Sequence, residues 1–246
     1  MSALGEFWDF VTDPDNWEGA RGIPVRTWAT IKVSAFATFA ATAIALPPAV
    51  WLAHVRRGGL LVVSIVNIGR ALPSFGIIAL VLPISIHYGF GLGFWPTFVA
   101  LVLLGAPPIF TNAYTGVREV DPGTVEAAAG MGLTGREVLT GVEIPNALPL
   151  IITGIRISAV QIVATAALGA LVGYQSLGSY VIEGQAQFDD GKLLTGAIFI
   201  ALLAIFTEIT FSVIERVSTP WIRVRRGPRH RTDPVEVRAE VMELNV

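Results

Sequence analysis

Five long apolar intervals, separated by shorter polar or glycine-rich links, account for most of this chain. An α-helix needs roughly 20 predominantly apolar residues to cross a hydrocarbon core about 30 Å thick, and each interval has that length. Only helices and closed barrels satisfy their backbone hydrogen bonds in lipid, so the pattern predicts an all-α integral membrane protein with five transmembrane helices. The intervals run approximately over residues 28–55, 60–86, 95–117, 148–172 and 193–215.

The two ends of the chain follow other patterns. Residues 1–26 place apolar side chains at helical spacing between acidic ones, which predicts a short helix lying in the membrane interface; a loosely ordered tail is the alternative. No basic region precedes an apolar one here, so we expect no cleavable signal peptide. Residues 218–246 have no apolar period and predict a disordered tail, which leaves residues 27–217 as the transmembrane domain. The tryptophans suited to headgroup depth are Trp8, Trp17 and Trp28.

The composition supports a membrane protein and excludes several kinds of site. Of the 246 residues, 53% are hydrophobic and only 15% are charged, whereas a soluble domain carries about 25% charge. The chain has no cysteine, so disulfides, thiolate metal sites and cysteine nucleophiles are excluded. His54, His87 and His230 are too scattered for a local metal site, and Gly191-Lys192 lacks the spacing of a phosphate-binding loop. We therefore expect no ATPase, metal or cofactor of its own, and no membrane enzyme.

Basic residues indicate which side of the membrane each link faces. With five helices the links alternate, and those on one side carry Arg56, Arg57, Arg118 and Arg136, against Lys192 on the other. Positively charged links stay in the cytoplasm. We therefore expect the link between the third and fourth intervals, and the C-terminus, to be cytoplasmic, and the N-terminus to be outside. The basic tail is expected to touch anionic lipid rather than nucleic acid.

The link over residues 121–145 predicts a first short helix. Asp121 followed by Pro122 is an N-cap with proline at the first helical position, where its missing N–H costs nothing. Three alanines after Glu126 continue this helix because alanine is the strongest helix former. Gly130 and Gly132 then end it or bend it sharply.

A second short helix is predicted in the same link. Thr134 and Glu137 have the spacing of a capping box, in which each side chain satisfies a backbone N–H near the other residue. Pro145 is expected to break the chain before the fourth interval. This link could be an ordinary folded loop. However, so short a link would expose several apolar side chains to water, which favours a surface that binds a partner. Those side chains are Val125, Met131, Leu133, Val138 and Leu139.

Three ionisable residues lie inside the apolar intervals, where charge is costly. Arg70, Arg156 and Glu208 each lie several residues from the cytoplasmic end of their interval, so all three fall at a similar depth. We predict that Glu208 pairs with Arg156 or Arg70 and ties together helices that move as a unit. The alternative is that each charge is hydrated by a translocation cavity.

The outer end of the fourth interval carries two further patterns. Gly169 and Gly173 form a GxxxG element, which permits close helix approach and is a candidate subunit contact. Tyr174, Tyr180 and Phe188 offer aromatic faces to which a quaternary ammonium group is attracted. Such residues are more often interfacial or core residues, so we do not predict an aromatic cage here.

The 121–145 link resembles the EAA loop of the permease subunits of ATP-binding-cassette importers, the superfamily that includes methionine importers. Glu126-Ala127-Ala128 is followed after three residues by Gly132 and after nine more by Val142-Glu143-Ile144-Pro145. The sequence departs from the family pattern at Val142, where the family has Ile, and at Ile144, where it has Leu. In that family the loop is the coupling helix that docks in a cleft of the ATPase subunit. The resemblance therefore implies the coupling residues Glu126, Ala127, Ala128, Gly130, Met131, Gly132 and Pro145.

Other segments resemble the osmoprotectant branch of these permeases, which serves glycine betaine, choline and carnitine. The resemblance implies a bacterial cytoplasmic membrane protein that works with a second permease copy or paralogue, two cytoplasmic ATPase subunits and an extracytoplasmic solute-binding protein. Another small solute, such as an amino acid, is an open alternative, and so is a self-sufficient secondary transporter or channel that uses Arg70, Arg156 and Glu208. The matching segments are residues 71–74, 120–122, 130–132, 154–156, 166–173 and 176–178.

Overall fold

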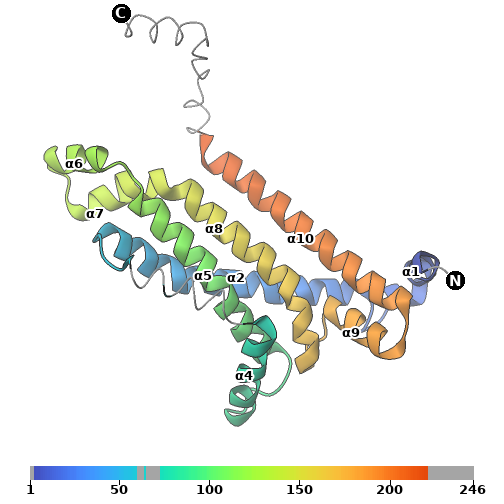
Figure 1. Ribbon diagram of the computed structural model, residues 1–246. Helices are drawn as coiled ribbons and strands as arrows, with labels where there is room; N and C mark the ends of the chain where they lie inside the picture. Colours follow the sequence, from blue (N-terminus) through green and yellow to red (C-terminus); the bar gives the residue numbers. More distant parts are fainter. Residues whose placement is uncertain (1–2, 60–63, 65–72, 221–246) are drawn as a thin grey trace, which may run out of the picture.

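Long helices dominate the computed structural model, and the all-helical prediction is confirmed for the part of the chain that it describes (Figure 1). Within that part, four elements are long and apolar enough to cross a membrane. These are α2 (Ile23–His54), α5 (Phe94–Arg118), the helical run Gly135–Val172 that contains α8 (Ile144–Thr165), and α10 (Asp190–Ser218). The structure describes residues 3–59, 64 and 73–220.

The predicted second span is only partly described. Its described portion is α4 (Ser74–His87), which has 14 residues and is apolar but shorter than a membrane span. Most of the preceding half of that span, including Arg70, lies outside the described residues. The described chain therefore supports four candidate spans rather than the five that the sequence predicts. In Figure 1, α4 projects to one side of the long helices.

Small residues bring the central helices close together. Along α2, Ala37, Ala41, Ala45 and Ala49 recur every four residues, are buried, and belong to one core cluster with residues of α5 and α8. Between α5 and α8, the Ser158 hydroxyl donates a hydrogen bond of 2.8 Å to a backbone carbonyl of α5. Small side chains allow the close backbone approach on which helix packing in lipid depends.

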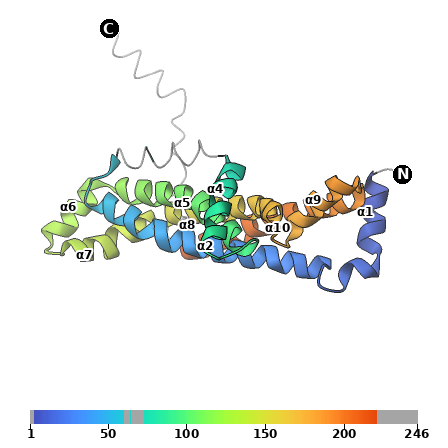
Figure 2. The same cartoon turned by 90° about the horizontal axis from the view of Figure 1, so that it is seen from below.

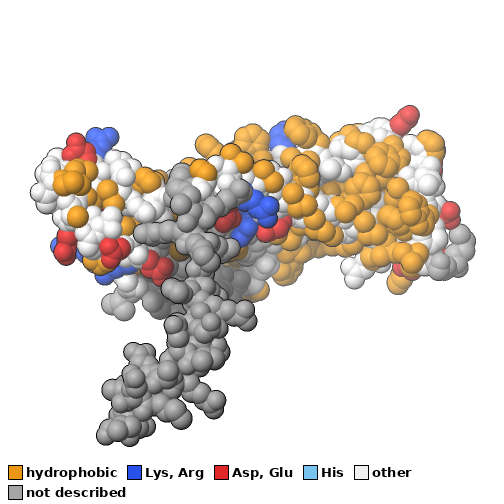
Figure 3. All heavy atoms as spheres, turned by 90° about the horizontal axis from the view of Figure 1, so that it is seen from above, with side chains coloured by type: hydrophobic (Ala, Val, Ile, Leu, Met, Phe, Trp, Pro, Cys, Tyr) orange, Lys and Arg blue, Asp and Glu red, His pale blue; other side chains and the backbone are white. Residues whose placement is uncertain are grey.

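The outside of the bundle is apolar, as expected for lipid contact. Hydrophobic side chains cover much of the face seen in Figure 3. α10 lies on the outside, and no residue in its most apolar 18-residue window is buried. Its exposed large side chains include Leu202, Ile205, Phe206 and Ile209.

The short elements gather at the two ends of the long helices (Figure 2). One end carries α6 (Pro122–Gly130) and α7 (Gly135–Val138), and the opposite end carries α1 (Ala3–Thr12) and α9 (Leu177–Gln187). The predicted N-terminal helix is confirmed as a helix, followed by the short 3-10 turn η1 (Pro14–Trp17). α2 begins earlier than predicted, at Ile23, so part of residues 1–26 belongs to the first span.

The fourth span departs from its prediction at both ends. Pro145 does not break the chain: α7 continues through a π-helical turn, η2 (Leu139–Glu143), directly into α8. Proline is accepted there because it occupies the first turn of α8. The preceding turn is π-helical, so the proline does not interrupt a regular series of i→i−4 hydrogen bonds. At the end away from α7, the α-helix stops at Thr165 and the chain runs on as the 3-10 helix η3 (Ala166–Val172).

Candidate functional site

Residues 121–145, called the coupling segment after the role that the sequence predicts for them, begin with the predicted cap. The Asp121 Oδ2 atom accepts hydrogen bonds of 2.9 Å from both the backbone N–H and the hydroxyl of Thr124. Pro122 occupies the first turn of α6. The side chain thus satisfies a backbone donor that the start of a helix leaves free, and the prediction is confirmed.

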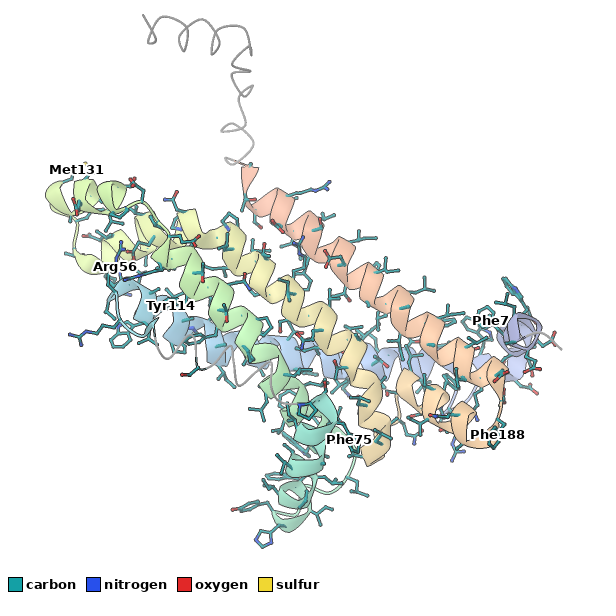
Figure 4. All side chains as sticks on the ribbon, viewed as in Figure 1. Phe7, Arg56, Phe75, Tyr114, Met131 and Phe188 are labelled. Atoms are coloured by element: carbon teal, nitrogen blue, oxygen red, sulfur yellow. The ribbon has the colours of Figure 1, made fainter. Side chains whose placement is uncertain are left out.

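A glycine turn closes α6. Gly132 has φ +91°, in the left-handed region that only glycine adopts without strain, and its N–H donates to the Ala129 carbonyl at 3.0 Å. Met131 immediately before it has 76% of its surface exposed. Figure 4 shows Met131 at the extreme tip of this end of the molecule.

The predicted capping box starts the second helix. The Glu137 Oε2 atom accepts from the Thr134 N–H at 2.7 Å, and the Thr134 hydroxyl accepts from the Glu137 N–H at 3.4 Å. Two turns fixed by local hydrogen bonds therefore hold α6 and α7 in a defined hairpin at the end of the bundle.

The predicted coupling residues do not all lie on the surface of this hairpin. Ala128 is only 3% exposed, so its methyl group packs within the chain and is not available to a partner. Pro145 is half-buried in the first turn of α8, apart from the tip. The exposed members are Glu126, Ala127, Gly130, Met131 and Gly132.

A polar contact that the sequence did not predict lies at the base of the hairpin. The buried carboxylate of Glu143, 2% exposed, contacts Nδ1 of His54 at 2.5 Å. Beside it, the Tyr114 hydroxyl donates to the Arg57 carbonyl at 3.1 Å. In Figure 4, Tyr114 and Arg56 lie at this same end of the bundle. The sequence signal was a glutamate directly before the apolar start of α8.

The predicted intramembrane ion pair is present. Arg156 Nε lies 3.6 Å from Glu208 Oε1, which joins α8 to α10. Arg156 Nη1 also lies 3.2 Å from Glu215 Oε2, so one guanidinium faces two carboxylates, and the second was missed because Glu215 ends the predicted span. The other predicted partner, Arg70, lies outside the described residues.

A cavity of about 380 Å³ lies between α2, α8 and α10. Its walls are mainly apolar, with hydroxyl groups from α2 and α10. The hydroxyl-bearing residues are Ser34, Thr38, Thr207 and Thr210.

A second charged cluster lies at the opposite end from the coupling segment. Arg26 of α2 is 2% exposed, and its Nη2 lies 3.0 Å from Glu183 Oε1 of α9. Lys192 of α10 lies 3.1 Å from the other oxygen of Glu183. The Arg26 guanidinium also lies over the Tyr180 ring, 4.1 Å from its centroid, which is a cation–π contact. This cluster, called the outer cluster because the sequence predicts that this end faces outside, ties three helices together.

The electrostatics of the outer cluster follow from these contacts. Burial favours a higher pKa for Glu183, but hydrogen bonds from Lys192 and Arg26 and their charges hold that pKa below its usual value. Burial raises the pKa of Tyr180, against the opposing charge of Arg26. The face of the Tyr180 ring is occupied by Arg26, so Tyr180 has a structural role here. Phe188, the other aromatic residue named for this region, is 94% exposed.

The GxxxG element at Gly169 and Gly173, a predicted subunit contact, has a different local structure from the one that the sequence suggests. The segment is 3-10 rather than α-helical, so the two glycines do not share one α-helical face. Gly169 is buried inside its own chain, where a Cβ atom would lie 2.5 Å from Thr97 of α5. Gly173 has φ +86° and ends the segment as a turn residue.

The described residues contain no group of three or more His, Asp or Glu side chains placed to hold a metal ion.

Comparisons with known proteins agree with this geometry. Two curated relatives are the carnitine transport permease OpuCB of Listeria monocytogenes, 32% identical over 82% of this chain and 91% of the relative, and the glycine betaine/carnitine/choline permease OpuCB of Bacillus subtilis, 33% identical over 79% and 88%. The inward-facing MetNI methionine ABC transporter has a chain with a TM-score of 0.69 and 25% identity, covering 78% of this chain and 94% of that one.

One protein-family profile matches most of the chain. The profile named "Binding-protein-dependent transport system inner membrane component" matches residues 36–224, which include the coupling segment and three of the four candidate spans in full. Such permeases are multi-pass proteins of the inner membrane and are the non-catalytic subunits of their transporters. The chain belongs to the family of binding-protein-dependent transport system inner membrane components.

Proposed function

We propose that this chain is the membrane-spanning subunit of an ATP-binding-cassette importer for compatible solutes with a quaternary amine, such as glycine betaine, choline or carnitine. The observation that carries the proposal is the capped α6–α7 hairpin. It presents an exposed surface around Met131 at one end of a bundle whose relatives bear the names of osmoprotectant permeases.

In this proposal the hairpin end faces the cytoplasm and docks on an ATPase subunit through Glu126, Ala127, Gly130, Met131 and Gly132. The excess of arginine in the links at that end supports the orientation, with the N-terminus outside. Two ATPase subunits, a second permease copy or paralogue and an extracytoplasmic solute-binding protein complete the transporter. ATP binding and hydrolysis then alternate the spans between two states, and each partner favours one of them.

The decisive experiment reconstitutes the chain with its ATPase and solute-binding protein in liposomes. Uptake of radiolabelled glycine betaine, choline, carnitine and methionine is measured with and without ATP. We expect ATP-dependent uptake of at least one quaternary amine and no uptake by the lone chain. Uptake of methionine alone would assign the chain to the amino-acid importers. ATP-independent uptake by the lone chain would identify a secondary transporter or channel and overturn the proposal.

A further inference from the structure

The coupling segment meets the end of α2 at one polar contact between residues far apart in sequence. His54 is the last residue of α2, and Glu143 closes the π-helical turn just before α8. Their 2.5 Å contact spans 89 residues of sequence. An ionised carboxylate can only accept a hydrogen bond, so with Glu143 ionised the Nδ1–H of His54 is the donor.

Burial makes this contact specific. Glu143 is 2% exposed, and a carboxylate removed from water is strongly destabilising unless it is paired and hydrogen-bonded. On its other side the imidazole lies close to the start of α7, where a Cβ atom at Gly135 would be 3.5 Å from His54 Nε2. The ring therefore lies between two parts of the coupling segment, α7 and η2.

The surrounding contact is apolar. Side chains of α2 and of the start of α8, including Val50 and Ile151, pack in one core cluster, and an open apolar groove of about 330 Å³ lies next to them. Apolar packing is non-directional, so the hydrogen-bonded pair is the directional contact between the two elements. The lining residues are Leu46, Pro47, Val50, Trp51, Leu139, Ile144, Leu148 and Ile151.

The π-helical turn is a reason to expect movement here. Turns of this kind are rare, occur mostly as single turns within α-helices, and are frequent at functional sites. In this chain the turn joins α7 to α8 covalently, whereas α2 is joined to the same segment through His54 and the apolar contact. α2 is a continuous helix from this joint to Arg26, about 40 Å away at 1.5 Å per residue.

We propose that His54 and Glu143 are positioning residues that form the joint through which α2 follows the coupling segment when the ATPase subunits close. The proposal rests on the proposed function, because it assumes that the segment is moved by an ATPase. Without the joint, the segment and α8 still move, but α2, held only by apolar packing, follows less closely, and more ATP is hydrolysed per solute transported.

The test measures ATP hydrolysis and solute uptake on the same reconstituted transporter. We expect His54→Phe, which keeps a ring but loses the donor, to retain hydrolysis within about twofold and to lower uptake per ATP by roughly fivefold to tenfold. This factor corresponds to about 1–1.4 kcal/mol, within the 0.5–2 kcal/mol by which residues between two sites change their coupling. His54→Gln, which keeps an N–H donor, should recover part of the loss. Uptake per ATP equal to that of the wild type in His54→Phe would refute the joint.

A matched control and a double variant separate the joint from a general loss of structure. His87 also ends a helix, α4, and is exposed, so His87→Phe should leave uptake per ATP unchanged. Because both residues act through one contact, His54→Phe combined with Glu143→Leu should lose no more than the worse single variant. Additive losses would contradict the proposal. If the Glu143 variants fold poorly, the His54 series carries the test alone.

A distance measurement provides a readout that does not depend on activity. The chain has no native cysteine, so spin labels attach only at Ile44→Cys on the exposed face of α2 and Arg136→Cys on α7. In the otherwise wild-type transporter the label distance should stay the same with and without ATP, since the two elements move together. In His54→Phe the distance should change on adding ATP. An identical response in both proteins would overturn the joint.

The outcomes also distinguish this proposal from the proposed function. If the wild-type complex shows no ATP-dependent uptake, the importer assignment fails whatever the variants do. If the wild type transports and His54→Phe transports with the same yield per ATP, the assignment stands and only the joint is refuted.

Discussion

The guanidinium of Arg156 on α8 pairs with two carboxylates of α10: its Nε lies 3.6 Å from Glu208 and its Nη1 lies 3.2 Å from Glu215. The two acidic residues are seven apart, so they lie on one side of α10 two turns from each other. Among the ion pairs of the described residues, these two join α10 to α8, whereas Lys192 joins α10 to α9.

Replacement of Arg156 should cost more than replacement of either carboxylate. Arg156→Gln leaves two acidic groups without a cation, whereas Glu208→Gln leaves Arg156 with Glu215. We expect Arg156→Gln to lower the melting temperature of the purified protein by roughly 2–8 °C, from a loss of about 1–2 kcal/mol. Because Glu208 is half exposed, Glu208→Gln should change the melting temperature little. Thermal melts of the single and double variants measure this, and equal effects of Arg156→Gln and Glu208→Gln would contradict the shared-guanidinium arrangement.

The two glycines of the hairpin should respond in opposite directions to alanine. Gly132 has φ +91°, so Gly132→Ala should strain the turn by about 1–3 kcal/mol and weaken ATPase binding. Gly130 is helical with open space around it, so Gly130→Ala should stabilise α6 by about 0.5–1 kcal/mol. Co-purification of the ATPase with each variant checks the first effect. The docking geometry would need revision if Gly132→Ala bound the ATPase as well as the wild type does.

The outer cluster should make stability depend on acidic pH. The pKa of Glu183 is held below its usual value of 4.5, so its carboxylate stabilises the folded state fully above pH 4.5. That contribution is lost as the pH falls below 4.5 through the lower pKa of the folded state. Melting temperatures measured from neutral pH downward should therefore fall more steeply in the wild type than in Glu183→Gln. Glu18→Gln, an exposed neighbour, is the control, and its profile should match that of the wild type.

Gly169 should prove to be an internal contact. Gly169→Ala places a methyl group 2.5 Å from Thr97 Cγ2, and such overpacking costs about 1–3 kcal/mol. Thr97→Ala removes the clashing atoms, so the double variant should recover stability. The measurement is thermal stability of the purified chain in detergent together with its oligomeric state. A loss of the oligomer in Gly169→Ala that Thr97→Ala does not restore would favour a subunit contact after all.

Local chemistry was predictable from the sequence, and long-range geometry was not. The Asp121 cap, the Thr134–Glu137 box and the Gly132 turn depend on residues within four positions, and all three are present. The Arg156–Glu208 pair was also predicted, because two opposite charges at one depth in lipid have few alternatives.

The missed contacts each required knowledge of packing. Ala128 is buried although it looks like its exposed neighbours, because helical phase is not fixed by an all-alanine stretch. His54 and Glu143 each looked like an ordinary residue at the end of a span, and nothing local brings them together. The chain break predicted at Pro145 is wrong. A proline before an apolar interval usually ends a helix, but here the π-helical turn allows the helix to continue through it.

The Arg26–Glu183 contact has a consequence for biosynthesis, because its two residues are 157 positions apart. At about 5–20 residues per second, the ribosome makes Glu183 roughly 8–30 s after Arg26. For that interval the nascent chain holds a cationic side chain near the membrane without the acidic residue that later pairs with it. The first helix therefore gains this ion pair only after α9 has been synthesised, and truncated chains that end before α9 should be recognised by quality-control proteases.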